Sequence, residues 1–253
     1  MNTIVLTNSN SATDINSKLS LRLTSPMRLE DSLICLSDMT MYYSWPNIAE
    51  RYGNNKFFYQ QNDITIENGF AEITILDGLY EIKDINNYLH FVMKSSGDKP
   101  DDKGHYGISI NANRIYNRVT ISVNNNYILE LPSKGFNEIL GFKNNLSIIN
   151  QEINGNEIPQ VERVESVFVH CNLAQNSYQL DSSLIYSFTP DKPAGSLLNI
   201  KPNFPQWRRT RNNVEVNQID VWLTDQNNKL LDLDDPKLKV ELQIMPAGFM
   251  KIT

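Results

Sequence analysis

The chain has 253 residues, of which 40% are hydrophobic and 21% are charged, and its formal net charge is −6. This composition is that of a globular protein large enough to bury a sizeable core, and the acidic balance argues against a specific nucleic-acid partner. No stretch approaches the roughly 20 apolar residues that a membrane span needs. Residues 1–6 lack the basic start of a secretion signal, so we expect none.

The first part of the chain shows the two-residue alternation of β-strands. Residues 18–24 carry leucine at every second position, and residues 33–43 form a second apolar stretch. Shorter strands are predicted at 56–59, 63–66 and 71–76, because turn-forming residues such as Asn and Gly separate them. These strands predict antiparallel sheet structure.

Residues 82–93 break this rhythm. Their apolar residues recur at intervals of three and four positions, and Gly97 lies just beyond the segment, where helices often end. We therefore predict one helix here. The charged, turn-forming stretch at about 94–106 predicts a long inserted loop on the surface.

The strand pattern then resumes and continues through the middle of the chain. A second short helix is predicted within residues 133–142, and the Asn- and Gly-containing stretch at about 143–160 predicts a second long inserted loop. Further strands are predicted at residues 108–110, 114–123, 127–131, 164–173 and 183–189.

The C-terminal part has the most regular alternation. Residues 218–224 predict one strand and residues 237–244 the last one. The inward side of the last strand should consist of Leu238, Val240, Leu242 and Ile244. The connection between these two strands is too long for a tight hairpin, and it suits a chain that crosses from one sheet to another.

Many short strands with few helices favour an all-β fold. The long crossing connections favour a single jelly-roll β-sandwich, with one or two short helices in inserted connections. We expect residues 1–253 to form one domain of this kind.

Residues able to perform chemistry are few and scattered. His90 and His105 have no second metal ligand at a short spacing, and neighbouring His170 and Cys171 point to opposite faces of a strand. We expect His170 to be structural, and Cys35 and Cys171 to be buried thiols.

An acidic cluster is the best candidate for a cation. A calcium ion needs six to eight oxygen ligands, of which three carboxylates in a turn supply only a part. The sequence therefore favours a solvated turn here, and we expect no metal, no cofactor, no catalytic residue and no enzymatic activity. The cluster consists of Asp232, Asp234 and Asp235.

Aromatic and basic residues are the candidates for an interface with another subunit or another protein. Arginine beside tryptophan can bind an anionic partner, although the same residues also suit a solvated surface or an intersubunit ion pair. The aromatic residues Tyr42, Tyr43 and Trp45 suit an interface or a core equally well. The candidates are Tyr42, Tyr43, Trp45, Trp207, Arg208, Arg209 and Arg211.

Five blocks of sequence, taken in order over roughly residues 39–244, resemble the minor capsid (penton) proteins of Polinton/Maverick elements and related viruses. The blocks are Met41–Ile48 with Tyr52–Phe57; Gly78–Tyr80 with Asp84–Leu89; Ile139–Phe142; Val167–Leu173 with Tyr178–Lys192; and Asp220–Asn228 with Leu233 and Asp235.

This resemblance implies a structural virion protein. It implies a single jelly roll that forms homopentamers at the fivefold vertices of an icosahedral capsid, beside a separate double-jelly-roll major capsid protein. The resemblance also implies that this chain is located in the virion after it has been synthesised inside the host cell. The alternative from another class is a soluble jelly-roll binding module, lectin-like or receptor-binding, in trimeric form for example.

Overall fold

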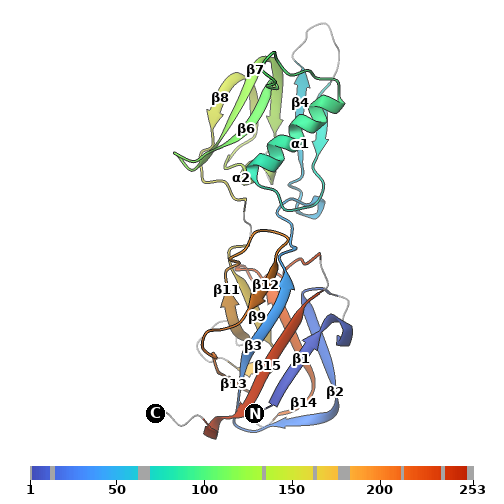
Figure 1. Cartoon of the computed structure of the whole chain (residues 1–253), viewed down its shortest axis with the longest axis vertical. Helices are drawn as coiled ribbons and strands as arrows, with labels where there is room; N and C mark the ends of the chain where they lie inside the picture. Colours follow the sequence, from blue (N-terminus) through green and yellow to red (C-terminus); the bar gives the residue numbers. More distant parts are fainter. Residues whose placement is uncertain are drawn as a thin grey trace. The chain divides into compact units, whose positions relative to one another are not determined.

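The computed structural model describes residues 2–11, 15–61, 69–132, 135–161, 164–175, 183–211, 214–234 and 237–249. It divides into two compact units, which are described separately. The sandwich unit comprises residues 1–45 and 164–253, and the inserted unit comprises residues 46–163 (Figure 1). The strand predicted at 63–66 lies outside the described residues.

The first sheet of the sandwich unit is built around one central strand. Its strands are β1 (Asn2–Thr7), β3 (Ser32–Tyr42), β10 (Ala174–Gln175), β12 (Leu197–Ile200), β13 (Arg208–Thr210) and β15 (Lys239–Pro246). The central strand β3 pairs with β15 along one edge, and β15 carries β1 on its outer side. Along the other edge of β3, β12 and β13 pair with opposite ends of the strand, and β10 follows β13.

The second sheet of the sandwich unit has four antiparallel strands. They are β2 (Lys18–Leu29), β9 (Val167–Cys171), β11 (Leu184–Phe188) and β14 (Val214–Thr224). Their order in space is β11-β9-β14-β2. Since β14 and β15 belong to different sheets, the long connection between them crosses from one sheet to the other, as predicted.

The strand order identifies the architecture. The sandwich unit has eight main strands in chain order when β12 and β13 are counted as one interrupted strand and the two-residue β10 is left out. They are β1, β2, β3, β9, β11, β12 with β13, β14 and β15. The first, eighth, third and sixth strands form one sheet, and the second, seventh, fourth and fifth form the other. This is the order of a jelly roll, in which two Greek keys wrap around one core. The predicted all-β jelly-roll class is confirmed.

The core of the sandwich unit follows the alternation of its strands. Leu242 on β15 is fully buried, and the predicted inward set on the last strand is at most 5% exposed. Residues two apart in a strand share one face. Burial of that face stabilises the unit by about 25 cal/mol for each Å² of apolar surface removed from water.

The inserted unit has a sheet of its own. Its strands are β4 (Lys56–Gln61), β5 (Ala71–Thr74), β6 (Ile108–Asn113), β7 (Arg118–Leu131) and β8 (Leu146–Asn154). The long strand β7 pairs with β4, β6 and β8, and β5 extends the sheet beyond β4. The short helix α2 (Phe136–Ile139) follows β7, inside the predicted helical segment.

Helix α1 (Ile82–Ser95) covers this sheet, and its prediction over 82–93 is confirmed (Figure 1). The apolar stripe of α1 packs into the same buried cluster as the strands of the inserted unit. Glu81 and Asp84 form a capping box at its start. The helix ends before Gly97, whose φ of 92° lies in the left-handed region that favours glycine.

Two parts of the predicted domain plan are corrected. The single domain 1–253 is instead two compact units, because residues 46–163 build their own sheet and core. The loop expected at about 143–160 contains the nine-residue strand β8, which pairs with β7 on both sides of a register shift. The loop expected at 94–106 is present, except that α1 extends to Ser95.

Candidate assembly surfaces and motif contacts

The first group of predicted interface residues lies mostly inside the sandwich unit. Tyr43 and Trp45 are only 6% and 3% exposed, and their ring centroids are 4.2 Å apart. Tyr43 is also fixed through its backbone N–H, which donates to Ser196 at 3.0 Å. Of the two interpretations left open by the sequence, the core is therefore correct for this pair. Tyr42 is half-buried, and the Lys237 ammonium lies 5.5 Å from its ring centroid.

The second group lies at the surface of the same unit, on a strand. Arg208 and Arg209 belong to β13, and Arg211 directly follows it. The Arg209 guanidinium lies 3.5 Å from the carboxylate of Asp31, so this side chain has a partner within its own chain. Arg211 is exposed, whereas Arg208 and Trp207 are half-buried. Contact of this group with another subunit stays a prediction.

One nitrogen in this group has no partner within the described residues. The Nε of Arg208 is buried and makes no hydrogen bond there, although a terminal nitrogen of the same guanidinium lies 3.4 Å from Gln206 Oε1.

In the acidic cluster, Asp235 lies outside the described residues. Among the residues that are described, no group of three His, Cys, Asp or Glu side chains is placed to hold a metal ion.

His170 is structural, as predicted. Its ring is fully buried and hydrogen-bonded through Nδ1 to Ser183 at 3.1 Å and through Nε2 to Thr224 at 2.9 Å. The indole of Trp222 stacks on it with a centroid distance of 5.3 Å and an interplanar angle of 8°. His170 therefore connects strand β9 to strand β14 within one sheet.

Both cysteines are free and buried, as predicted. Burial raises the pKa of the Cys35 thiol to about 11 and that of Cys171 to about 12, because a thiolate is poorly solvated there. The thiolate is the reactive form of cysteine. Both side chains are accordingly inert thiols at neutral pH.

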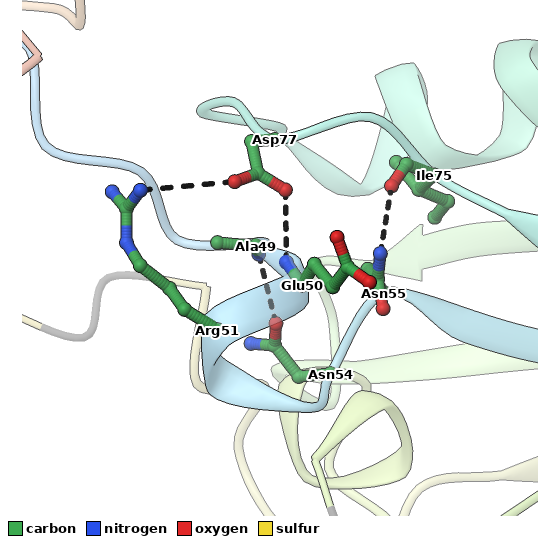
Figure 2. Close-up of polar contacts among 7 residues, drawn as sticks. All are labelled: Ala49, Glu50, Arg51, Asn54, Asn55, Ile75 and Asp77. Carbon is green, nitrogen blue, oxygen red and sulfur yellow. Dashed lines mark hydrogen bonds and ion pairs between the residues drawn. The ribbon is translucent and has the colours of Figure 1, made fainter.

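In the inserted unit, several blocks of the resemblance meet at one junction (Figure 2). Asn54 accepts a hydrogen bond from the backbone of Ala49 at 2.9 Å, and Asn55 donates one to the carbonyl of Ile75 at 3.3 Å. Asp77 accepts from the backbone N–H of Glu50 at 2.8 Å. Asn55 thus links the Tyr52–Phe57 block to Ile75, and Asp77 links the turn before Gly78–Tyr80 to Glu50.

Asn47 completes the junction. Its side-chain oxygen accepts from the Tyr80 backbone N–H at 2.9 Å, and its Nδ2 lies 2.8 Å from the carbonyls of both Tyr80 and Val161. Three asparagines at this junction are almost fully buried, and the sequence reasoning missed them. They are Asn47, Asn54 and Asn55. The feature of the sequence that could have indicated them is an asparagine next to apolar residues.

Other blocks also contact one another or occupy special backbone positions. Within the sandwich unit, the Val167–Leu173 and Asp220–Asn228 blocks are adjacent strands, joined by the His170–Trp222 stack. Gly141 of the third block has a φ of 80°, and a Cβ there would lie 2.3 Å from the carbonyl of Glu157. The position therefore requires glycine.

Two surface features were not singled out from the sequence. Phe204, in the loop between β12 and β13, is 83% exposed. A cleft of about 300 Å³ lies in the same unit, where β2 ends and β14 begins. No helix of the described residues is long and apolar enough to cross a membrane.

Comparisons with known proteins find similarity among solved structures. No family model and no curated protein matches the sequence. Among solved structures, the chain is similar over almost its whole length to a viral penton protein, the class that the sequence blocks resemble. That structure is the crystal structure of selenomethionine-labelled mavirus penton protein. It shares 10% identity and a TM-score of 0.45, and the match covers 96% of this chain and 97% of the other.

Proposed function

We propose that this chain is a minor capsid (penton) protein of a virion, and that five copies form a ring at each fivefold vertex of an icosahedral shell. Its partners are then further copies of itself and a double-jelly-roll major capsid protein. The eight-strand order of the sandwich unit supports the proposal, since jelly rolls are common among viral capsid domains.

The observation that carries the proposal is the contact between blocks of the resemblance. Met41–Ile48 and Gly78–Tyr80 are far apart in sequence, yet Asn47 joins them. The same holds for Val167–Leu173 and Asp220–Asn228, which His170 and Trp222 join. Residues of the resemblance blocks thus contact one another within each unit, as we expect of a signature that is shared for structural reasons.

A ring of five needs contacts between unlike patches of neighbouring subunits, and a specific interface buries at least about 1,000 Å² in total. The surface residues Trp207, Arg208, Arg209 and Arg211 are candidates for such a patch. Charged residues at the rim of an interface mainly change the association rate and its salt dependence.

The test is the mass of the purified chain in solution, followed by electron microscopy with and without the major capsid protein. We expect a species of five times 29.0 kDa that appears as closed rings. A mass of three times 29.0 kDa would favour the binding-module alternative. Monomers alone at high concentration, even with the major capsid protein present, would refute the penton proposal.

A further inference from the structure

The hairpin that joins β6 to β7 ends in an ordered turn at residues 114–117. The side-chain oxygen of Asn113, the last residue of β6, accepts hydrogen bonds from the backbone N–H groups of Ile115 at 3.2 Å and Tyr116 at 3.4 Å. Asn117 has a φ of 51°, in the left-handed region that asparagine tolerates in turns. Polar and backbone contacts therefore hold this turn, and its apolar side chains are not needed to form it.

Two consecutive apolar side chains are exposed at this turn. Ile115 is 85% exposed and Tyr116 is 68% exposed, and Ile115 is the most exposed large apolar residue in the described part of the chain. The neighbouring strand β8 pairs with β7 only as far as Thr120, so the turn lies beyond the end of β8 (Figure 1). Single exposed apolar residues are ordinary. Two together on an ordered, protruding turn are a candidate contact surface, which we call the hairpin tip (residues 114–118).

The hairpin tip is also positively charged, on a protein that is negative as a whole. Arg114 and Arg118 flank the two apolar residues, and residues 103–129 contain no Asp or Glu, although the net charge of the chain is −6. The first carboxylate along the paired strand β8 is that of Glu152, which accepts a hydrogen bond from the Ser122 hydroxyl at 2.8 Å. The tip therefore complements a negatively charged surface.

This combination of side chains suits the surface of a lipid bilayer. Amphipathic elements that lie at such a surface place apolar side chains at the boundary between headgroups and acyl chains, and keep arginine among anionic headgroups. Tyrosine is also favoured at this depth. A nucleic acid could stack on Tyr116 and bind the arginines but would gain nothing from Ile115. A protein partner would need a preformed apolar pocket that fits the protruding tip, whereas a fluid lipid layer needs none.

We propose that the hairpin tip inserts Ile115 and Tyr116 into the interfacial layer of an anionic lipid bilayer, with Arg114 and Arg118 on the lipid headgroups. This contact goes beyond the proposed function, and each copy of the chain carries it whatever the number of copies in an assembly. If five copies form a ring, their five tips act together, so the ring binds more tightly than a single copy.

The first test measures co-sedimentation with two kinds of vesicle, phosphatidylcholine alone and equal parts of phosphatidylcholine and phosphatidylserine. The parent chain should bind the mixed vesicles more tightly. The double variant Ile115→Ser with Tyr116→Ser should weaken this binding at least about tenfold, because two inserted apolar side chains are lost. The matched control is Phe204→Ser in the sandwich unit, since Phe204 is 83% exposed. It should bind like the parent chain.

The charge of the tip is tested in the same assay. Arg114→Ser with Arg118→Ser should weaken binding to the mixed vesicles about tenfold and have a smaller effect on vesicles of phosphatidylcholine alone, because each arginine is attracted to anionic lipid. Added salt should weaken binding of the parent chain more than that of this variant. Equal binding of the parent chain to both kinds of vesicle would overturn the assigned anionic partner.

The second test locates the inserted side chain. A nitrobenzoxadiazole label on Ile115→Cys should shift its fluorescence to the blue with mixed vesicles and be quenched by spin-labelled lipid. The same label on Phe204→Cys should do neither. The native thiols interfere little, because Cys35 and Cys171 are buried and their pKa values are raised to about 11 and about 12.

The outcomes separate this inference from the proposed function. Failure of the parent chain to bind mixed vesicles, or unchanged binding by the Ile115→Ser, Tyr116→Ser variant, would overturn the lipid contact. Ring formation, measured by sedimentation without lipid, tests the penton proposal independently of either result. Loss of rings in that variant, with no vesicle binding by the parent chain, would show that the tip contacts another copy instead. If the double variant does not fold, as judged by its denaturation midpoint, Ile115→Ser alone replaces it and should also weaken vesicle binding.

Discussion

The carboxylate of Asp98 shows how single residues fix the loop after α1. Asp98 is 6% exposed and accepts hydrogen bonds from the hydroxyls of Tyr59 at 2.8 Å and Tyr127 at 2.9 Å, and from the amide of Gln61. A buried carboxylate is tolerated when its oxygens are hydrogen-bonded in this way. Burial and then the neighbouring Asp98 raise the pKa of Tyr127 to about 12.

This geometry predicts a loss of stability at alkaline pH. The folded-state pKa of Tyr127 is raised above the unfolded value of about 10. Its contribution is therefore fully present below about pH 10 and is lost as the pH rises towards about 12. In Tyr127→Phe, the free energy of unfolding should be lower at pH 7 and should fall less steeply above pH 10. Urea titrations at several pH values measure both. An unchanged alkaline slope would contradict the assignment.

Sequence patterns alone could not settle the position of individual aromatic residues. Tyr43 and Trp45 suited an interface or a core equally well in the sequence, and their burial and ring contact are visible only in the folded chain. His170 was easier to predict. It follows apolar residues in a strand, and a histidine without a second ligand nearby is usually hydrogen-bonded in a core.

At the scale of elements, β15 makes the clearest prediction. Leu242 is fully buried, so Leu242→Ala should leave a cavity and lower the free energy of unfolding by about 2–5 kcal/mol. Gln243→Ala on the opposite face is the control and should cost less than about 1 kcal/mol. Chemical denaturation measures both. Equal midpoints for the two variants would show that the assigned inward face is wrong.

Elements differed in how well the sequence predicted them, for a physical reason. Helix α1 and strand β15 bury one complete face, so their periodicity is visible in the residues themselves. In contrast, β8 pairs only with β7 and has Ile148 as its one fully buried residue. An edge strand with polar residues on both faces looks like a loop, and so the loop predicted at 143–160 was wrong.

For the whole molecule, the two units should respond separately to damage in their cores. In the inserted unit, Phe136 stacks on Phe57 with a centroid distance of 4.7 Å. Phe136→Ala should cost that unit about 3–5 kcal/mol. Amide hydrogen exchange should then show lower protection in residues 46–163, with β9 and β14 unchanged. Leu242→Ala should give the reverse pattern. A uniform loss of protection over both units in either variant would contradict this independence.

The division into units was hidden from the sequence because local patterns do not show which distant strands pair. The jelly-roll class followed from many strands with long crossings, and β14 and β15 bore it out. The boundaries at residues 45 and 164 depend on pairings such as β4 with β7, which no local period encodes.

The hydrogen bond from Asn47 to the carbonyl of Val161, at 2.8 Å, has a consequence for the order of folding. The jelly roll is interrupted between β3 and β9, and such distant strands pair slowly because a long loop must close first. During synthesis the inserted unit is complete before β9 exists, and domains generally fold as units in that order. Once the inserted unit has folded, it holds residues 47 and 161 close together. The effective loop between β3 and β9 is then short, and less chain entropy is lost when the two halves of the sandwich pack.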